Sequence, residues 1–463
     1  MSFQNIKLSG EQKIALTLPI HGAVLIKGGA GSGKTLVSVK RAEMLLADHP
    51  DLFRTTNVAI FTYTTELVSA IEGMVYGQPI AVHGLDRWIF RFLGLGRDDF
   101  IDDGVLRRAR EHARAVTFNG VRDKAIANKS DDFYCAEISW LKGRRISTLE
   151  QYKSTKRTGR GTEDRVTMTD RELLWKLFGA YNCKLAESHI RDWDDRVLDA
   201  LAIVEKPGFV RPFSHVVIDE AQDFSFSRIS LIRQLVSEET NSITIVADSA
   251  QQIYQSGFSW SDLGLKVVGR SVEFKRNYRN TRQIAEAAYS LMRHEKDNTD
   301  FTEMIPSSRE GVKPIVLKGS TSWCLAEVIR RIKGVGSYDK TVVAVYSRKR
   351  VVEVEQFFEN AGVPVRTSAR KIKVCNFGKA CVTASTYHSL KGLQFDHVYL
   401  LDMNDQVFST KGLDPDEISK MRKLIYVAMT RACETLTIVP GMSPTPLLAE
   451  IDSALMTEVL ENG

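Results

Sequence analysis

The chain has 463 residues, of which 43% are hydrophobic and 26% charged, a globular balance that excludes wholesale disorder. Its net charge of +6 does not by itself indicate a nucleic-acid binder, because the placement of charge matters more than the total. No apolar run approaches the ~18 residues that span a membrane, and no Cys-x-x-Cys pair is present. Residues 1–10 contain no apolar segment, so we expect no signal peptide. We therefore expect a cytoplasmic protein of about three domains with free thiols and no membrane partner.

Short apolar runs alternate with helical patterns along the chain, which predicts α/β domains with parallel sheets. The strands predicted in the first half are residues 23–26, 58–61, 215–218 and 242–246. The strands predicted in the second half are residues 341–346, 365–367, 381–384, 396–401 and 435–439. The pattern favours two parallel-sheet domains.

The region between the second and third predicted strands is rich in Arg, Lys, Asp and Trp and has a helical pattern. It predicts a helical insertion in the first domain. Within it, residues 141–171 contain nine Lys or Arg and four Asp or Glu, so much of the net charge is concentrated there. A nucleic-acid-facing surface and a solvated basic segment are both compatible with this. The predicted domain parts are residues 1–95, 96–200, 201–272 and 273–463.

A glycine-rich segment follows the first predicted strand and precedes a predicted helix. It matches the pattern G-x-x-x-x-G-K-[ST] with residues Gly28, Gly29, Ala30, Gly31, Ser32, Gly33, Lys34 and Thr35. In this context the pattern predicts a phosphate-binding loop, because its backbone N–H groups can surround phosphate oxygens at a helix N-terminus. We expect Lys34 to contact the β- and γ-phosphates of ATP and Thr35 to bind Mg²⁺.

Two adjacent acids follow the predicted strand at 215–218. Asp219 and Glu220 would lie at the carboxyl edge of a parallel sheet, where α/β proteins bind ligands. We expect Asp219 to hold Mg²⁺ and Glu220 to orient and deprotonate the attacking water. Together with the phosphate loop, this pair predicts an ATP hydrolase.

These two segments and seven others occur in an order that resembles the UvrD/Rep-like branch of superfamily 1 helicases. The others are residues 8–12, 61–64, 82–84, 246–254, 276–279, 386–395 and 426–432. The resemblance implies an α/β fold of two RecA-like parallel-sheet motor domains with a helical insertion in the first. It also implies ATP-driven movement on single-stranded DNA in the 3′→5′ direction.

The resemblance further implies roles for single residues around the nucleotide. Gln12 would read the adenine edge, Tyr278 would lie near the base, and Gln394 would hydrogen-bond a ribose hydroxyl. The residues implied at the γ-phosphate are Gln251, Arg279 and Arg431.

A second set of residues is implied in contact with DNA. These are Thr62, Tyr63, His83, Trp260 and His388. For Trp260, ordinary packing in a core is an equally supported interpretation.

Several features depart from the family pattern. Gln394 stands where Glu is usual, which predicts altered affinity rather than loss of binding, and Leu36 stands where an Arg often covers the adenine. The motif at 386–395 follows the strand at 341–346 closely, so we expect no large 2B-type helical subdomain between them. We also expect no nuclease-like region after the motif at 426–432. We therefore expect a compact motor.

Three functions fit the sequence to different degrees. The leading one is an ATP-dependent DNA helicase or translocase. The alternative is a DNA-stimulated ATPase subunit of a repair or phage-defence complex, which gates a partner nuclease without unwinding DNA itself. A P-loop kinase or small-molecule NTPase would need an acceptor pocket and lid in place of Arg279 and Arg431.

Overall fold

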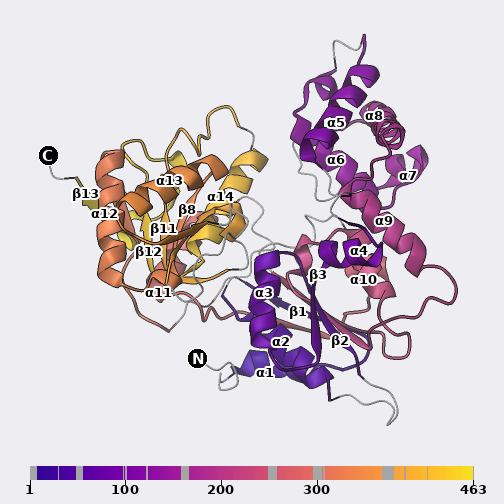
Figure 1. The fold of residues 1–463 in the computed structure, drawn as a ribbon, viewed down its shortest axis with the longest axis horizontal. Coiled ribbons are helices and arrows are strands. Elements are labelled where there is room, and N and C mark those ends of the chain that lie inside the picture. Colours follow the sequence, from indigo (N-terminus) through magenta and orange to yellow (C-terminus); the bar gives the residue numbers. More distant parts are fainter. Residues whose placement is uncertain are drawn as a thin grey trace. The chain divides into compact units, whose positions relative to one another are not determined.

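The computed structural model forms two compact units (Figure 1). The first comprises Met1–Lys27 with Lys34–Phe274, and the second comprises Gly28–Gly33 with Lys275–Gly463. The residues that the structure describes are 8–29, 31–47, 56–96, 99, 102–120, 124–157, 166–248, 258–295, 305, 308–367, 380–390, 393–413 and 415–461.

The first unit contains a six-stranded sheet in the order β3-β2-β4-β5-β1-β6. Its strands are β1 (Ala23–Gly28), β2 (Val58–Thr62), β3 (Ile80–Gly84), β4 (His215–Ile218), β5 (Ser242–Asp248) and β6 (Ser271–Phe274). β2 pairs in parallel with β3 and β4, and β4 pairs in parallel with β5. Val58 is level with both Ile80 and His215, so the carboxyl ends of these strands meet at one edge.

Helices cover both faces of this sheet. They are α1 (Gly10–Thr17), α2 (Lys34–Leu45), α3 (Thr65–Met74), α4 (Leu85–Phe92), α9 (Trp193–Val204) and α10 (Phe226–Gln234). Along β2, Ala59 and Phe61 belong to one core, and Val58 and Ile60 belong to another. The first core takes side chains from α4, α9 and α10, and the second takes them from α2 and α3. Apolar residues on both faces of the strands explain why they read as continuous apolar runs.

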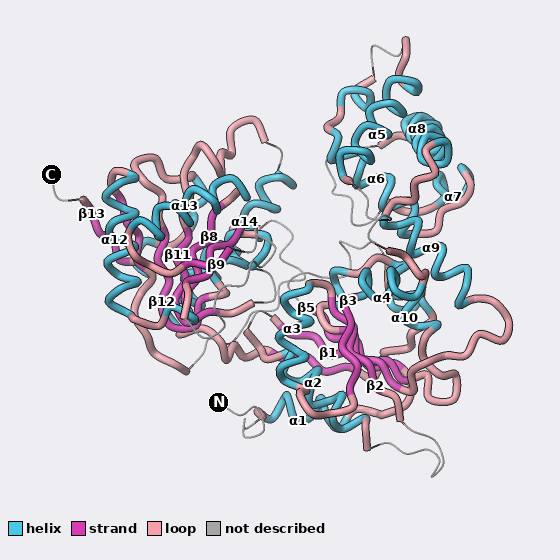
Figure 2. The backbone as a smooth tube through the Cα atoms, in the orientation of Figure 1, coloured by secondary structure: helices cyan, strands magenta, loops and turns pink. Residues whose placement is uncertain are grey.

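A helical segment lies between β3 and β4 in the sequence (Figure 2). Besides α4 and α9, it contains α5 (Asp103–Thr117), α6 (Asp131–Gly143), α7 (Leu149–Ser154) and α8 (Met168–Glu187). Side-chain caps fix the helix starts: Ser130 accepts a hydrogen bond from the Phe133 N–H, and Thr167 begins a capping box. The segment has its own apolar core, which includes Leu106, Leu141 and Leu174.

The second unit contains a seven-stranded sheet in the order β13-β7-β12-β11-β8-β10-β9. Its strands are β7 (Ile315–Lys318), β8 (Thr341–Val345), β9 (Val365–Thr367), β10 (Val382–Thr386), β11 (Phe395–Leu400), β12 (Ala432–Ile438) and β13 (Thr457–Leu460), and the pairings between neighbours are parallel. Its helices are α11 (Arg282–Met292), α12 (Thr321–Val335), α13 (Arg348–Asn360) and α14 (Pro415–Met429). Along β8, Val342 and Ala344 face one core and Val343 and Val345 the other, so this sheet is also covered on both faces.

The predicted fold class, α/β with two parallel sheets and a helical segment, is confirmed. All nine predicted strands are present. The prediction missed β3, β6, β7 and β13, whose burial is partial because three of them are edge strands and β7 lies next to an edge. Among the described residues, no helix is long and apolar enough to span a membrane.

Candidate active site

The phosphate loop joins β1 to α2, and its glycines have the backbone conformations that such a loop needs. Gly31 and Gly33 have φ angles of +78° and +83°, which side-chain-bearing residues rarely adopt. The buried Ser32 hydroxyl donates to the Gly29 carbonyl at 2.9 Å and closes the turn. Lys34 is the first residue of α2, so the positive end of this helix lies at the loop. Ala30 lies outside the described residues.

Asp219 is held by two hydroxyls from α2. Thr35 Oγ1 donates to Asp219 Oδ2 and Ser38 Oγ donates to Oδ1, each at 2.9 Å. Three residues apart on a helix, Thr35 and Ser38 face the same side. The backbone N–H of Asp219 donates to the Phe61 carbonyl on β2, which extends the ladder by one residue and fixes the acid at the sheet edge.

The environment of Asp219 disfavours its charge. The carboxyl group is fully buried, and burial together with the adjacent Glu220 raises its pKa to about 7, against the opposing effects of Ser38, Thr35 and Lys34. A cation bound here would reverse that balance. The oxygens of Thr35 and Asp219 are hard ligands of the type that Mg²⁺ takes, so these residues fit the ion.

Lys34 is connected to Glu220 through a chain of polar contacts. Lys34 Nζ lies 3.3 Å from Asp248 Oδ2, at the end of β5. The Asp248 backbone N–H donates to Gln222 Oε1 at 2.9 Å, and Gln222 Nε2 donates to the Glu220 carboxylate. Lys34, which is expected to meet the phosphates, and Glu220, which is expected to meet the attacking water, are therefore linked by polar contacts in the nucleotide-free structure.

Glu220 has an unusual backbone conformation. Its φ and ψ angles are 52° and 44°, in the left-handed region, immediately before a short 3₁₀ turn at Ala221–Asp223. For a residue other than glycine this conformation costs on the order of 1 kcal/mol or more, and such strain concentrates at functional sites. The side chain is partly exposed, while its neighbour Asp219 is fully covered. The turn thus separates a buried acid from one that water can reach.

Gln12 and Arg41 organise the region expected to face the base. Gln12 is 5% exposed and forms a reciprocal cap with Ser9 at the start of α1. Arg41 on α2 is fully buried and donates to the carbonyls of Leu16, in the last turn of α1, and of Leu18 and Pro19 just beyond it. Burial and the nearby Arg270 lower the Arg41 pKa to about 10. Arg41 thus ties α1 to α2.

The second unit carries the other residues expected at the nucleotide. Tyr278 and Gln394 are exposed, and Arg279 is partly buried. Arg431 is 6% exposed and donates to the carbonyls of Val427 at 2.9 Å and Leu393 at 3.2 Å. Gln251 lies outside the described residues. The roles implied for these residues stay predictions.

The residues expected to contact DNA divide into exposed and covered groups. Tyr63 is 48% exposed and meets the Phe224 ring edge-on, and His388 is also exposed. Thr62 is fully buried, so its side chain is not on the surface. His83 packs near the Phe61 ring, and burial lowers its pKa. Trp260 is 6% exposed in the first core, which is the packing alternative rather than an open stacking platform.

Several basic side chains of the segment 141–171 are paired or covered, among those that the structure describes (141–157 and 166–171). Arg157 Nη2 lies 2.6 Å from the Glu137 carboxylate, and these side chains are 8% and 2% exposed. Arg171 donates to backbone carbonyls at the end of α7, and Arg145 pairs with Glu205. Arg157 and Arg171 are therefore covered, whereas the Arg145 side chain is 40% exposed, and a nucleic-acid-facing surface on this segment stays a prediction.

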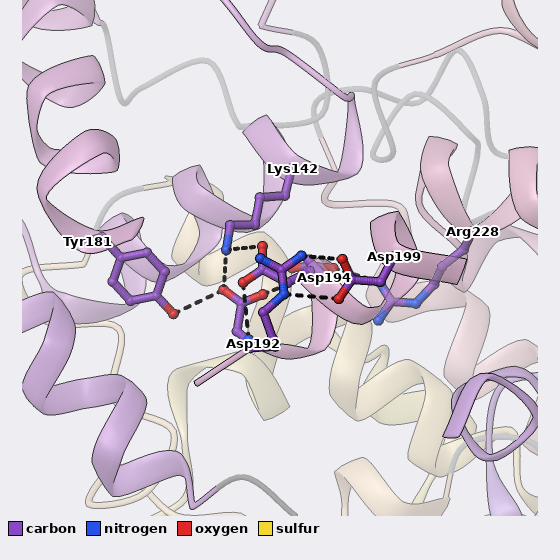
Figure 3. A network of polar contacts seen from close by, with 8 residues as sticks. Lys142, Tyr181, Asp192, Asp194, Asp199 and Arg228 are labelled. Atoms are coloured by element: carbon purple, nitrogen blue, oxygen red, sulfur yellow. Dashed lines mark hydrogen bonds and ion pairs between the residues drawn. The ribbon is translucent and has the colours of Figure 1, made fainter. Parts of the chain in front are cut away.

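Lys142 belongs to a second buried network (Figure 3). Its side chain is 2% exposed, and its ammonium nitrogen lies 2.7 Å from a carboxylate oxygen of both Asp192 and Asp195. The Tyr181 hydroxyl donates to the same Asp192 carboxylate at 3.1 Å. The window 141–171 excluded these acids, so counting charges in it overstated the free positive charge.

Several contributors to the site were not found from the sequence. Ser38, Asp248 and Arg41 act through partners distant in sequence, and Gln222 lay inside a recognised motif without a role. Arg41 could have been found from the sequence, because a charged residue among the apolar positions of a predicted helix indicates a buried side chain that needs polar partners.

A phosphate loop at the carboxyl edge of a parallel sheet, with a buried acid bonded to the loop threonine, defines a P-loop nucleotide-binding protein. Comparison with known families agrees with this class. Residues 8–260 match the UvrD/REP helicase N-terminal domain, and residues 369–440 match the UvrD-like helicase C-terminal domain. The chain belongs to the UvrD/REP helicase family.

Individual relatives are distant. The chain is 24% identical to the ATP-dependent DNA helicase srs2 of Schizosaccharomyces pombe, over 78% of this chain and 44% of that protein. It is 22% identical to a probable DNA helicase of Mycoplasma pneumoniae, over 93% and 83%. It is 23% identical to the ATP-dependent DNA helicase PcrA of Bacillus subtilis, over 72% and 46%. The chain thus spans less than half the length of two of these relatives.

Proposed function

We propose that this chain is an ATP-dependent DNA helicase or translocase that moves 3′→5′ on single-stranded DNA. The observation that carries the proposal is the cluster in which Thr35 and Ser38 hold the buried Asp219 beside the phosphate loop. Membership of a helicase family supports DNA as the polymer along which the chain moves.

In this proposal the nucleotide replaces contacts that the chain makes on its own. Lys34 exchanges Asp248 for the β- and γ-phosphates, and Asp219 and Thr35 hold Mg²⁺. When bound, Mg²⁺ neutralises charge on the phosphates. Glu220 accepts a proton from the attacking water. Gln222, which bonds Glu220, keeps this acid oriented while Lys34 changes partner.

The second unit supplies the remaining charge in this proposal. Arg279 and Arg431 stabilise the negative charge that develops on the γ-phosphoryl group, as arginine fingers do. Binding of ATP by both units would favour a closed form, and loss of the γ-phosphate would release it. If each unit grips the strand differently in the two forms, the cycle produces steps along the backbone.

The test is steady-state ATPase activity of the purified chain with and without single-stranded DNA, followed by displacement from 3′-tailed and 5′-tailed duplexes. We expect DNA to stimulate hydrolysis and the 3′-tailed duplex to be opened. Stimulation without displacement would favour an ATPase subunit that gates a partner nuclease. ATP binding without any response to DNA would contradict the proposal.

A further inference from the structure

Two asparagines flank Arg279 and bond to each other. Asn277 is 5% exposed and Asn280 is fully buried, and Asn277 Nδ2 donates to Asn280 Oδ1 at 2.7 Å. Asn277 Oδ1 accepts from the backbone N–H groups of Arg279 at 2.9 Å and Asn280 at 3.2 Å. The backbone on both sides of the Arg279 Cα is therefore held by the side-chain amide of Asn277.

The other end of this pair reaches the peptide that carries Arg431. Asn280 Nδ2 donates to the Thr430 carbonyl at 3.1 Å and also to the Ala432 carbonyl. These two carbonyls lie on either side of Arg431: Thr430 follows α14, and Ala432 is the first residue of β12. The carbonyl of Arg431 itself accepts from the Phe395 N–H at 3.0 Å. Three consecutive carbonyls are therefore fixed.

A second link joins the same segments. Arg309 Nη1 donates to the Arg279 carbonyl at 2.9 Å, and its Nη2 pairs with Glu434 on β12. This link is 42% exposed at Arg309 and 47% at Glu434, whereas the asparagine pair is buried. Water screens the outer link but not the inner one, so Asn280 is the stiffer connection.

We propose that Asn280, supported by Asn277, is a positioning residue that holds Arg279 and Arg431 in one fixed frame. This inference rests on the proposed function, in which both arginines meet the γ-phosphoryl group. The amide of Asn280 uses both of its N–H groups and its oxygen, so neither segment can move without the other unless these bonds break. Asn280 and Ala432, which are bonded to each other, are 152 residues apart in the sequence. Each adjoins one of the two arginines, so Arg279 and Arg431 would approach and leave the phosphate together.

The experiment is a double-mutant cycle on the full chain, with ATP hydrolysis measured at saturating single-stranded DNA. The variants are Asn280→Ala, Arg431→Ala and both together. We expect Asn280→Ala to lower kcat roughly 10- to 100-fold with KM for ATP nearly unchanged, because misplacement by about 1 Å has that effect. In the Arg431→Ala background, Asn280→Ala should lower kcat little further.

The matched control is Asn404→Ala, which removes two backbone hydrogen bonds, from Gln406 and Val407, in the same unit. Its kcat should stay at the wild-type value. If Asn280→Ala does not fold, Asn280→Ser keeps one donor and should give a smaller fall in kcat with the same dependence on Arg431. Thermal unfolding of each variant identifies those that are folded.

Different outcomes overturn different statements. A kcat for folded Asn280→Ala or Asn280→Ser equal to that of Asn404→Ala would overturn the inference alone. An effect of Asn280→Ala that is undiminished in the Arg431→Ala background would also overturn it. Wild-type hydrolysis by Arg431→Ala would overturn the proposed role of that arginine, and the inference with it.

Discussion

Lys34 and Asp248 form an ion pair with 3.3 Å between Nζ and Oδ2, and their side chains are only 7% and 9% exposed. The pair joins the first residue of the phosphate-loop helix to the last residue of β5. A buried ion pair is costly to break by removing one partner. In the proposed function a phosphate group displaces Asp248, because it offers Lys34 a stronger counter-charge.

Lys34→Ala should abolish turnover. The change removes the cation at the phosphates, and loss of one such group costs about 100- to 1,000-fold in kcat. Steady-state ATPase measurements check this. The control is Lys40→Ala on the same helix, where Lys40 pairs with Glu43 three residues away and should be dispensable. Wild-type activity of Lys34→Ala would refute the phosphate-site assignment.

Glu220→Gln should retain ATP binding and lose hydrolysis. The amide keeps the shape of the side chain but cannot accept the proton, a loss of roughly 100- to 10,000-fold. Binding of a fluorescent nucleotide and single-turnover hydrolysis separate the two effects. Glu238→Gln, at a side chain that is 79% exposed, is the control. Hydrolysis that persists in Glu220→Gln would require a different base.

The pKa of Asp219 predicts how the stability of the nucleotide-free protein varies with pH. Because its pKa is raised to about 7 in the folded chain, the native state holds a proton that the unfolded state loses near pH 4. This group therefore makes stability fall as pH rises from about 4 to about 7 and adds no further slope above that. Denaturation midpoints measured across this range should fall less steeply for Asp219→Asn. If the wild type and Asp219→Asn lost stability equally steeply with pH, the raised pKa of Asp219 would be contradicted.

Arg41→Ala should destabilise the first unit by about 3 kcal/mol, because carbonyls at the end of α1 and just beyond it lose a charged donor. Since Arg41 holds α1, which carries Gln12, the variant should also raise KM for ATP. Urea denaturation and ATPase kinetics measure the two effects. Arg107→Ala, at a pair whose side chains are 68% and 49% exposed, should change stability by less than about 1 kcal/mol. Equal stabilities of the two variants would contradict this role.

Arg157 and Lys156 are adjacent in sequence and should behave differently. Arg157→Ala leaves the buried Glu137 carboxylate without this partner and should cost about 3–5 kcal/mol in the helical segment. Lys156 is exposed, so Lys156→Ala should leave stability unchanged. Denaturation and the salt dependence of DNA binding distinguish them. A reduced salt slope in Lys156→Ala would indicate a phosphate contact, whereas a stable Arg157→Ala would contradict the ion-pair role.

Much of the fold follows from local patterns in the sequence. Buried strands such as β4 and β8 are recognisable because both faces are apolar. The phosphate loop and Asp219 were recognisable because their chemistry requires specific residue types at fixed spacing. The partly exposed strands β7 and β13 have weaker patterns and depend on neighbours for pairing.

The contacts that organise the site could not be read in the same way. Ser38 and Asp219 are 181 residues apart, and Asn280 and Thr430 are 150 residues apart. Nothing local distinguishes these polar residues from helix surface or turn residues. Trp260 illustrates a different difficulty. It follows the motif at 246–254 closely, which suggested a contact with DNA, but its side chain packs in the first core.

The level pairing of β2 and β4 has a mechanical consequence. Asp219 bonds the backbone of Phe61, two residues before the exposed Tyr63, and the Tyr63 ring rests on Phe224, five residues after Asp219. Two short paths therefore run from the acid to the same surface side chain, both through well-packed material of low compressibility. The surroundings of the exposed Tyr63 ring are therefore set from two sides by the segment that carries Asp219.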